Sequence, residues 1–283
     1  MRNLLIVLVS LFAGIPLLAS GQSDTLSQEK KHTLTLSSLV SSNASYYGQT
    51  AEESLPFAYV DLKFKTSWGW YIAGGGYHLL KENNFPSEMH LKSGFEFNLG
   101  PKTDLEVGYT RSFYSKASPL LQASNPNSLS ATIGIDHLFR TELVADYNFG
   151  QSEDIFISLE NSKNILLGQW RKENTFYLKP GVNIVAGTQR FYTTYIEERK
   201  QWMDGLNSLL PFPVQQSNEK QTTETTSVST DFSLLSYNFN LPLIYYRGKG
   251  AFMLSYQLSV LSDKNAQGKR SNSFFSLGYF YQL

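Results

Sequence analysis

The stretch of sequence that decides the fold is residues 89–99, which read Met89-His90-Leu91-Lys92-Ser93-Gly94-Phe95-Glu96-Phe97-Asn98-Leu99. Its odd-numbered positions carry apolar side chains, except at Ser93, and its even-numbered positions carry polar or small ones. Successive side chains of a β-strand point to opposite faces, so this alternation predicts a strand with one apolar and one polar face.

The same pattern recurs on both sides of this stretch and predicts twelve strands. They lie at residues 32–42, 56–67, 70–80, 88–99, 103–115, 128–138, 141–149, 154–166, 174–192, 226–247, 250–262 and 271–283. Most of them are long enough to cross a bilayer at a tilt. The strands of a soluble β-sandwich, the alternative all-β architecture, usually span only about 5–6 residues.

The connections between these strands alternate in length. Short ones fall at residues 67–69, 100–102, 139–140 and 248–249, and long ones at residues 43–55, 81–87, 116–127, 193–225 and 262–270. Two connections depart from the pattern, since residues 151–153 are short and residues 167–173 are long for their side. Short turns at one end and long loops at the other are typical of outer-membrane barrels. We therefore expect an all-β, transmembrane, antiparallel up-and-down barrel of about twelve strands, with short periplasmic turns and long extracellular loops.

Composition and charge exclude several functional classes. The 283 residues carry 24 Lys and Arg against 24 Asp and Glu, so the chain lacks the basic surplus of a nucleic-acid binder. It has no Cys, which excludes disulfide scaffolds, thiolate metal sites and cysteine nucleophiles. None of its four His lies two, three or four residues from another, so we expect no metal site and no cofactor.

The N-terminal segment has the pattern of a secretory signal peptide. Arg2 precedes an apolar run from Leu4 to Leu18, and Ala19 and Gly21 are the small residues of a cleavage site. An N-terminal membrane anchor is the alternative, but the run falls short of the roughly 20 residues that a spanning helix needs. We expect residues 1–21 to be a signal peptide, residues 22–283 to be the barrel, and the location to be the outer membrane.

The end of the chain resembles the C-terminal assembly signal of outer-membrane barrels, at Ser276, Gly278, Tyr281 and Leu283. The chain also resembles uncharacterised outer-membrane barrels of the Bacteroidota, mainly over its last third. Three features carry this resemblance: Gln22 after the cleavage site, residues 187–192 (GTQRFY) and residues 241–249 (LPLIYYRGK). The resemblance implies a fold and a location but no activity. It also implies contact with the outer-membrane insertion machinery and with outer-membrane lipid and lipopolysaccharide as partners.

The polar faces of the strands would line the interior of the barrel. The predicted lumen-lining residues are Asp61, Lys63, Lys65, Lys92, Glu96, Asp104, Glu106, Asp136, Glu142, Asp146, Glu160 and Lys179, which are eight acids and four lysines. They fit either a lumen filled by salt bridges or a narrow pore that favours cations. We expect a narrow channel or transporter for small polar solutes. The alternative is a non-transporting structural or interaction subunit whose loops bind a partner protein.

A barrel enzyme such as a lipase is the third hypothesis. Outer-membrane phospholipases carry a His two residues before a Ser on one strand, closely followed by Asn and Gly, and no His of this chain precedes a Ser in that way. A nucleophile needs a base within hydrogen-bond reach, so we expect no enzyme and no catalytic residue. Likewise, Gly74-Gly75-Gly76 is expected to relieve crowding or to bend a strand rather than to bind phosphate.

The longest loop, residues 193–225, contains apolar side chains at a spacing of three to four residues. Trp202, Met203, Leu206 and Leu210 belong to this series, which predicts a short amphipathic helix that ends before Pro211. We expect this helix to be a lid over the barrel mouth or a docking face for a partner, unless it only shields the rim.

Overall fold

The computed structural model describes residues 32–45, 54–81, 85–114, 125–150, 153–171, 174–188, 232–262 and 270–283. The predicted signal peptide and the loop helix with Trp202, Met203, Leu206 and Leu210 lie outside these ranges and stay predictions. Within the described ranges, no helix is long and apolar enough to cross a membrane.

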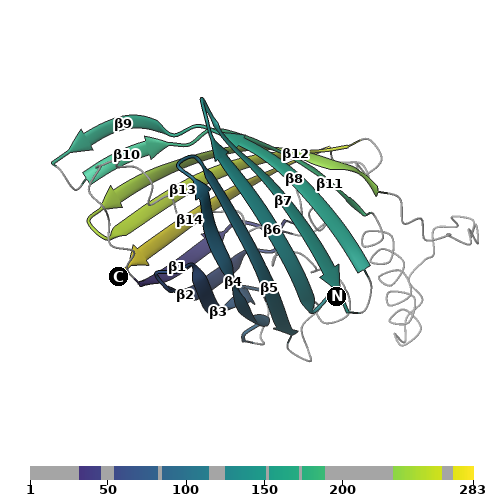
Figure 1. Cartoon of the computed structure of the whole chain (residues 1–283). Coiled ribbons are helices and arrows are strands. Elements are labelled where there is room, and N and C mark those ends of the chain that lie inside the picture. The colour runs from purple at the N-terminus through teal and green to yellow at the C-terminus, as the bar shows by residue number, and fades with distance from the viewer. Residues whose placement is uncertain are drawn as a thin grey trace, which may run out of the picture.

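Within the described ranges, fourteen antiparallel strands form one sheet that curves into a barrel (Figure 1). They are β1 Thr33–Ser41, β2 Phe57–Lys65, β3 Trp70–Leu79, β4 Glu88–Gly100, β5 Thr103–Tyr114, β6 Asn127–Asp136, β7 Arg140–Phe149, β8 Glu153–Ser162, β9 Ile165–Trp170, β10 Asn174–Leu178, β11 Gly181–Thr188, β12 Phe232–Arg247, β13 Gly250–Leu261 and β14 Ser271–Gln282. Each strand from β1 to β7 pairs with the next, β8 pairs with β11, and β11 to β14 continue the ring until β14 pairs with β1. Twelve strands thus close the barrel, which confirms the predicted fold class.

The remaining strands, β9 and β10, form a hairpin that extends β8 and β11 past the end of β7. The C-terminal part of β12, from Leu243 to Arg247, pairs with β10. Its N-terminal part, from Phe232 to Asn240, pairs with β11. The predicted strands 154–166 and 174–192 are therefore each broken in two. Pro180 lies at one break, where its missing N–H and fixed φ interrupt the ladder.

This hairpin also corrects one predicted connection. Residues 167–173 do not form a long connection, because β9 runs on to Trp170 and the chain turns directly after it, where Arg171 adopts a φ of 58°. The connection between β9 and β10 is therefore a short turn, like the others predicted at this end of the barrel. The short connection between β7 and β8 remains an exception at the other end, since Phe149 pairs directly with Glu153.

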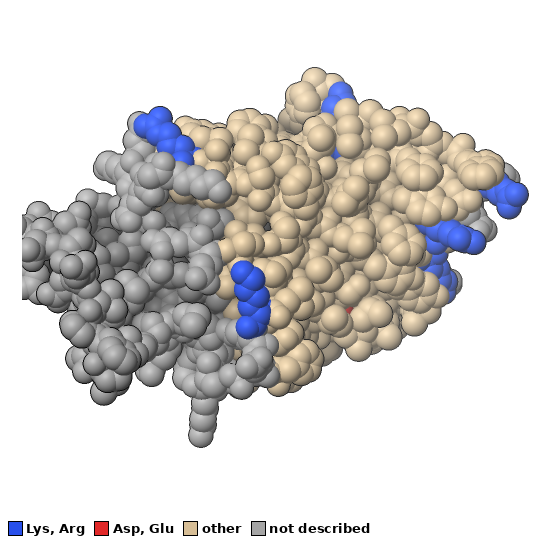
Figure 2. All heavy atoms as spheres, turned by 180° about the vertical axis from the view of Figure 1, so that it is seen from behind, with Lys and Arg blue, Asp and Glu red and all other residues tan. Residues whose placement is uncertain are grey.

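The apolar faces of the strands point away from the barrel axis. Along β2, the outward residues Val60, Leu62 and Phe64 are 39–51 % exposed. Figure 2 shows one side of the barrel, on which the surface between the two ends is nearly free of charged side chains. Such a belt of exposed apolar side chains needs an apolar covering, as a bilayer would supply.

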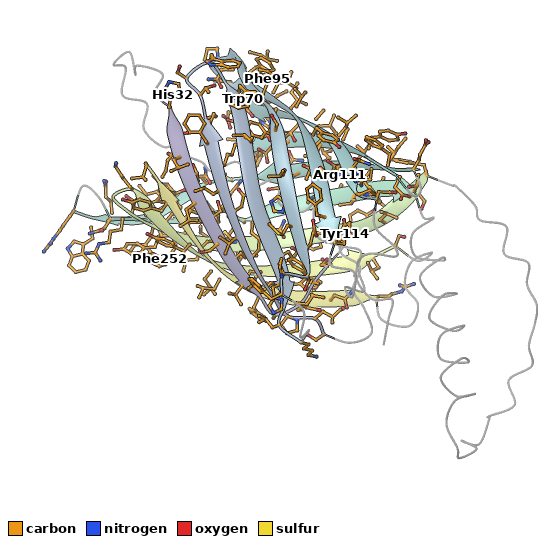
Figure 3. The ribbon with its side chains drawn as sticks, turned by 90° about the horizontal axis from the view of Figure 1, so that it is seen from below. His32, Trp70, Phe95, Arg111, Tyr114 and Phe252 are labelled. Atoms are coloured by element: carbon orange, nitrogen blue, oxygen red, sulfur yellow. The ribbon has the colours of Figure 1, made fainter. Side chains whose placement is uncertain are left out.

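Aromatic side chains gather at the short-turn end of this belt. Phe176, Tyr245, Phe252 and Tyr279 form a row across β10 and β12–β14, with ring centroids 4.6–6.5 Å apart. Trp68 packs between Trp70 and Phe95 at the same end. Figure 3 labels Trp70 and Phe95 there. Amphipathic rings at this level are what a membrane interface favours.

Candidate functional site

Among the described residues, the inward face of β2–β8 carries the charged side chains of the barrel interior. On β2, the predicted lumen residues Asp61, Lys63 and Lys65 occupy the positions between the exposed apolar side chains. Most of the predicted lumen residues contact one another or an unpredicted partner, in three clusters that follow one another along the wall. Their role in a pore stays a prediction, but their positions define the only charged interior surface among the described residues.

The first cluster joins three lysines to two glutamates. Lys63 and Lys65 both donate to the carboxylate of Glu96, with Lys65 Nζ 2.7 Å from Glu96 Oε2. Lys92 Nζ lies 3.1 Å from Glu106 Oε1. Glu96 and Glu106 sit directly opposite each other on β4 and β5, a placement in which like charges repel. The three lysines offset that repulsion.

Tyr71 completes this cluster. Its hydroxyl donates to Glu106 Oε1 over 2.7 Å, and Lys63 Nζ lies 4.0 Å from the centre of its ring. The side chain is 0 % exposed. Gly94 and Gly108 leave room for it, because a Cβ at either position would collide with the Tyr71 hydroxyl. The tyrosine therefore packs across β4 and β5 beneath the charged groups.

Removing the Tyr71 hydroxyl tests this packing. Tyr71→Phe leaves the partly buried Glu106 carboxylate with one donor fewer, and we expect a loss of about 1 kcal/mol in the free energy of unfolding. The measurement is a urea titration of the folded fraction in detergent. Tyr279→Phe is the matched control, since that ring lies on the outward face, where it packs on Phe252. An unchanged midpoint for Tyr71→Phe would contradict the hydrogen bond to Glu106.

The second cluster surrounds Arg140. Its guanidinium reaches three carboxylates: Nε is 2.7 Å from Glu142 Oε1, Nη1 is 3.3 Å from Asp136 Oδ2, and Nη2 is 2.9 Å from Asp104 Oδ1. Glu142 is 2 % exposed, whereas Asp136 is 50 % exposed at the short-turn end. One cation for three anions leaves the cluster negative.

The neighbouring predicted residues add to the negative charge. Glu160 lies opposite Glu142 in the ladder between β7 and β8, and Lys179 follows β10, where its backbone N–H donates to Pro242 O over 2.9 Å. Asp146 is buried on β7. Gly134 passes beneath the Arg140 guanidinium, because a Cβ there would meet both Arg140 and the Asp104 carboxylate.

The third cluster lies nearer the long loops. His90 Nε2 is 3.1 Å from Asp61 Oδ2, and the His90 ring stacks on Tyr59 with centroids 5.6 Å apart. Gly75 makes this possible, since a Cβ there would lie 2.9 Å from the His90 ring. Gly75 therefore acts as predicted for the glycine run, by relieving crowding. Glu88, which was not predicted, is buried beside this cluster and accepts a hydrogen bond from Ser112.

The opposite wall of the barrel is neutral. Inward positions of β1 and β12–β14 hold short polar side chains, among which Gln257 donates to Ser259 over 2.9 Å and Asn238 donates to Ser236 over 3.1 Å. An apolar group shares the interior with them: Leu39, Ala44, Phe57, Tyr77, Leu79, Ala251, Met253 and Phe280. Described charged residues thus lie on one side of the lumen, and neutral ones on the other.

Two of the unpredicted residues have identifiable signals in the sequence. Arg140 falls in the predicted turn 139–140, although it shares its face with Glu142 two residues later. Tyr71 lies at a strand end, where an aromatic side chain is expected to face the membrane interface. It alternates with the exposed residue Ile72, however, so its side chain faces inward. The aromatic side chains of Phe57, Tyr77, Tyr114 and Tyr246 likewise face the interior group rather than the membrane.

The predicted assembly signal lies in β14, at the seam of the barrel. Ser276 faces inward and bonds Ser41 over 3.0 Å, and Gly278 packs against Leu39 and Met253. Tyr281 pairs with Leu36 and Gly250, and Leu283 exchanges backbone hydrogen bonds with Leu34. Recognition of this strand by an insertion machinery stays a prediction. Across the described residues, no group of three or more His, Asp or Glu could hold a metal ion.

No protein-family model matches the chain, and no curated protein matches its sequence. The chain is similar to solved structures at low identity. The KdgM porin is 8 % identical, with 88 % of this chain and 98 % of that chain covered and a TM-score of 0.47. LpxR from Salmonella typhimurium is 9 % identical, with 88 % and 99 % covered and a TM-score of 0.43. The outer membrane protein OprD from Pseudomonas aeruginosa is 12 % identical, with 88 % and 65 % covered and a TM-score of 0.35.

Proposed function

We propose that this barrel spans the bacterial outer membrane and forms a narrow channel for small polar solutes that favours cations. One observation carries the proposal: the inward face of β2–β8 holds a partly hydrated set of charged groups with an excess of acids, while the outward face is apolar. A barrel that only needed a packed interior could fill it with neutral side chains, as β12–β14 do.

Water access to the charged groups supports a channel. Near the short turns, the side chains of Lys65 and Glu96 are 35 % and 27 % exposed, and Asp136 is 50 % exposed. Hydrated charged groups of this kind can exchange their interactions for those with a passing ion.

The charge balance supports cation preference. The structure adds two buried acids, Glu88 and Asp154, to those predicted, and one base, Arg140. A cleft lined by one sign of charge with low-dielectric walls concentrates ions of the opposite sign. The inward acids and lysines of β2–β4 balance, so the excess of acids lies on β5–β8, and that part of the wall would concentrate cations.

The apolar belt and its aromatic rings support the location. We further propose that outer-membrane lipid and lipopolysaccharide surround the barrel, that the insertion machinery assembles it, and that it binds no nucleic acid and is not an enzyme. In this orientation, the short turns face the periplasm and the long loops face the exterior.

Ion selectivity tests the proposal. In a planar bilayer with a KCl gradient, the reversal potential should indicate K⁺ preference over Cl⁻, and Asp104→Asn with Glu106→Gln should weaken that preference. The double variant removes two inward negative charges and leaves Lys92 unpaired. Glu153→Gln is the matched control, because it removes an exposed acid at the long-loop end. Anion preference in the parent protein would overturn the proposal.

A specific observation favours the second candidate, a non-transporting subunit whose loops bind a partner. Nearer the long loops, Phe57, Tyr77 and Leu79 pack the interior and are almost completely buried. If this packing closes the lumen, the inserted barrel should show no conductance and should instead retain a partner protein through its loops.

A further inference from the structure

Arg111 is an unusual residue on the outward face of the barrel. It lies on β5 between the exposed aromatic residues Tyr109 and Phe113, nearer the long loops than Trp70 and Phe95 are (Figure 3). Its Nη1 donates to Asn127 Oδ1 over 2.7 Å, and its guanidinium lies 5.8 Å from the centre of the Phe113 ring. The ion pairs of the described residues do not include Arg111.

Arg111 lies at the long-loop edge of the outward surface formed by β5–β8. It pairs with Asn127, which begins β6, and the same row continues to Phe149 at the end of β7 and Glu153 at the start of β8. Glu153 is three strands away, roughly 14 Å at ordinary strand spacing. The Tyr109 hydroxyl also donates to Asn127 Oδ1 over 2.7 Å, so Arg111, Tyr109 and Asn127 form one polar group.

An apolar groove lies directly below this polar group. It has a volume of about 710 Å³, its floor includes the small residues Ser93, Ala131 and Ala145, and its sides include Phe95, Tyr109 and Tyr147. Tyr109 belongs to both features and joins them. Val107 in the groove is four residues from Arg111, which is about 13 Å along a strand. A ligand that reached both would need an anionic head and an apolar chain.

We propose that this outward wall binds a phosphorylated, acylated lipid of the outer leaflet, with a phosphate on Arg111 and an acyl chain in the groove. The inference rests on the proposed membrane-spanning barrel. Arginine presents a planar fork of donors that matches phosphate geometry. The groove lies within the apolar belt, where hydrocarbon chains of a bilayer are the surrounding solvent, so an acyl chain is the occupant that fits it rather than a soluble partner.

Lipid retention tests this site on the full-length protein. The folded barrel is reconstituted in phosphatidylcholine nanodiscs that contain bis-phosphorylated lipid A, and the lipid A retained after release is counted by native mass spectrometry. We expect retention by the parent and about tenfold less by Arg111→Gln, which removes a charged hydrogen-bond donor. Ala131→Leu with Ala145→Leu, which fills the groove, should lower retention as well. Arg247→Gln at the opposite end and Ala58→Leu on the outward face of β2 are the matched controls.

The outcomes distinguish binding of the phosphate head from binding of the acyl chain of the lipid. Dephosphorylated lipid A should be retained no better by the parent than by Arg111→Gln. Equal retention of bis-phosphorylated lipid A by the parent and both site variants would overturn the inference, and so would a preference for phosphatidylglycerol over lipid A. Insertion and conductance are measured on the same samples. A barrel that inserts and conducts without retaining lipid contradicts only the lipid site, whereas a barrel that does not insert contradicts the proposed function.

Discussion

Deletion of Tyr281, Gln282 and Leu283 is expected to abolish stable insertion and to reduce the membrane level of the protein to background. These residues close the ring, because Gln282 pairs with Thr35 and donates its backbone N–H to Lys249 over 3.0 Å. Leu283 and Leu34 exchange two backbone hydrogen bonds of 2.8 and 3.1 Å. Without them, the short-turn ends of β1 and β13 would present unpaired backbone groups to lipid, each of which costs several kcal/mol.

The measurement is the amount of heat-modifiable protein in isolated outer membranes. A second variant, Tyr281→Ala with Leu283→Ala, keeps the backbone pairing and removes only the side chains of the apparent assembly signal. If that variant is also lost, the side chains carry the recognition; if it inserts, the backbone seam alone explains the loss. Normal membrane levels of the truncated chain would contradict both the seam and the signal.

Replacement of Arg140 by Gln is expected to destabilise the barrel by about 3–5 kcal/mol, the usual cost of removing one partner from a buried ion pair. Most of this cost falls on Glu142, which is almost fully buried and receives the 2.7 Å hydrogen bond from Arg140 Nε. Asp104 and Asp136 are more exposed and can recover solvation from water. The midpoint of urea unfolding, followed by the heat-modifiable gel band, reports the change.

Two further variants are the controls for Arg140→Gln. Arg140→Gln with Glu142→Gln removes the uncompensated buried charge and should recover much of the lost stability. Arg247→Gln, at the exposed last position of β12, should stay within about 0.5 kcal/mol of the parent. A parent-like midpoint for Arg140→Gln alone would contradict the buried network around this guanidinium.

The alternation of residues 89–99 and its repeats was enough to predict the barrel, because period two assigns each side chain to one of two faces without reference to other strands. It was not enough at residues 163–181. Ile165, Leu166 and Leu167 are consecutive apolar residues, and all of β9 is exposed, so no buried face imposes a period there. The hairpin exists because β12 is long enough to pair with both β10 and β11, a property of distant residues.

The candidate site was predictable as a surface but not as a set of contacts. The inward acids and lysines follow from the phase of each strand, whereas the pairing of Lys63 with Glu96, or of Arg140 with Asp104, depends on register and shear across several strands. Register also placed Gly75 beneath His90 and Gly108 beneath Tyr71, which no local pattern encodes. These close approaches hold Tyr71 and His90 in the site and could not be read from the sequence, whereas Arg140 was missed because it was assigned to a turn.

The measurement that tests the central claim most directly is the accessibility of single cysteines in the membrane-inserted protein. The chain has no native Cys, so each introduced thiol reports alone. Ser255→Cys on the inward face of β13 should react with a membrane-impermeant thiol reagent, whereas its neighbour Leu254→Cys, which is exposed on the outward face, should stay unreactive in lipid. Ser130→Cys and Ala131→Cys should repeat the contrast on β6. Reaction at both positions of each pair, or at neither, would contradict a water-filled barrel that spans the membrane.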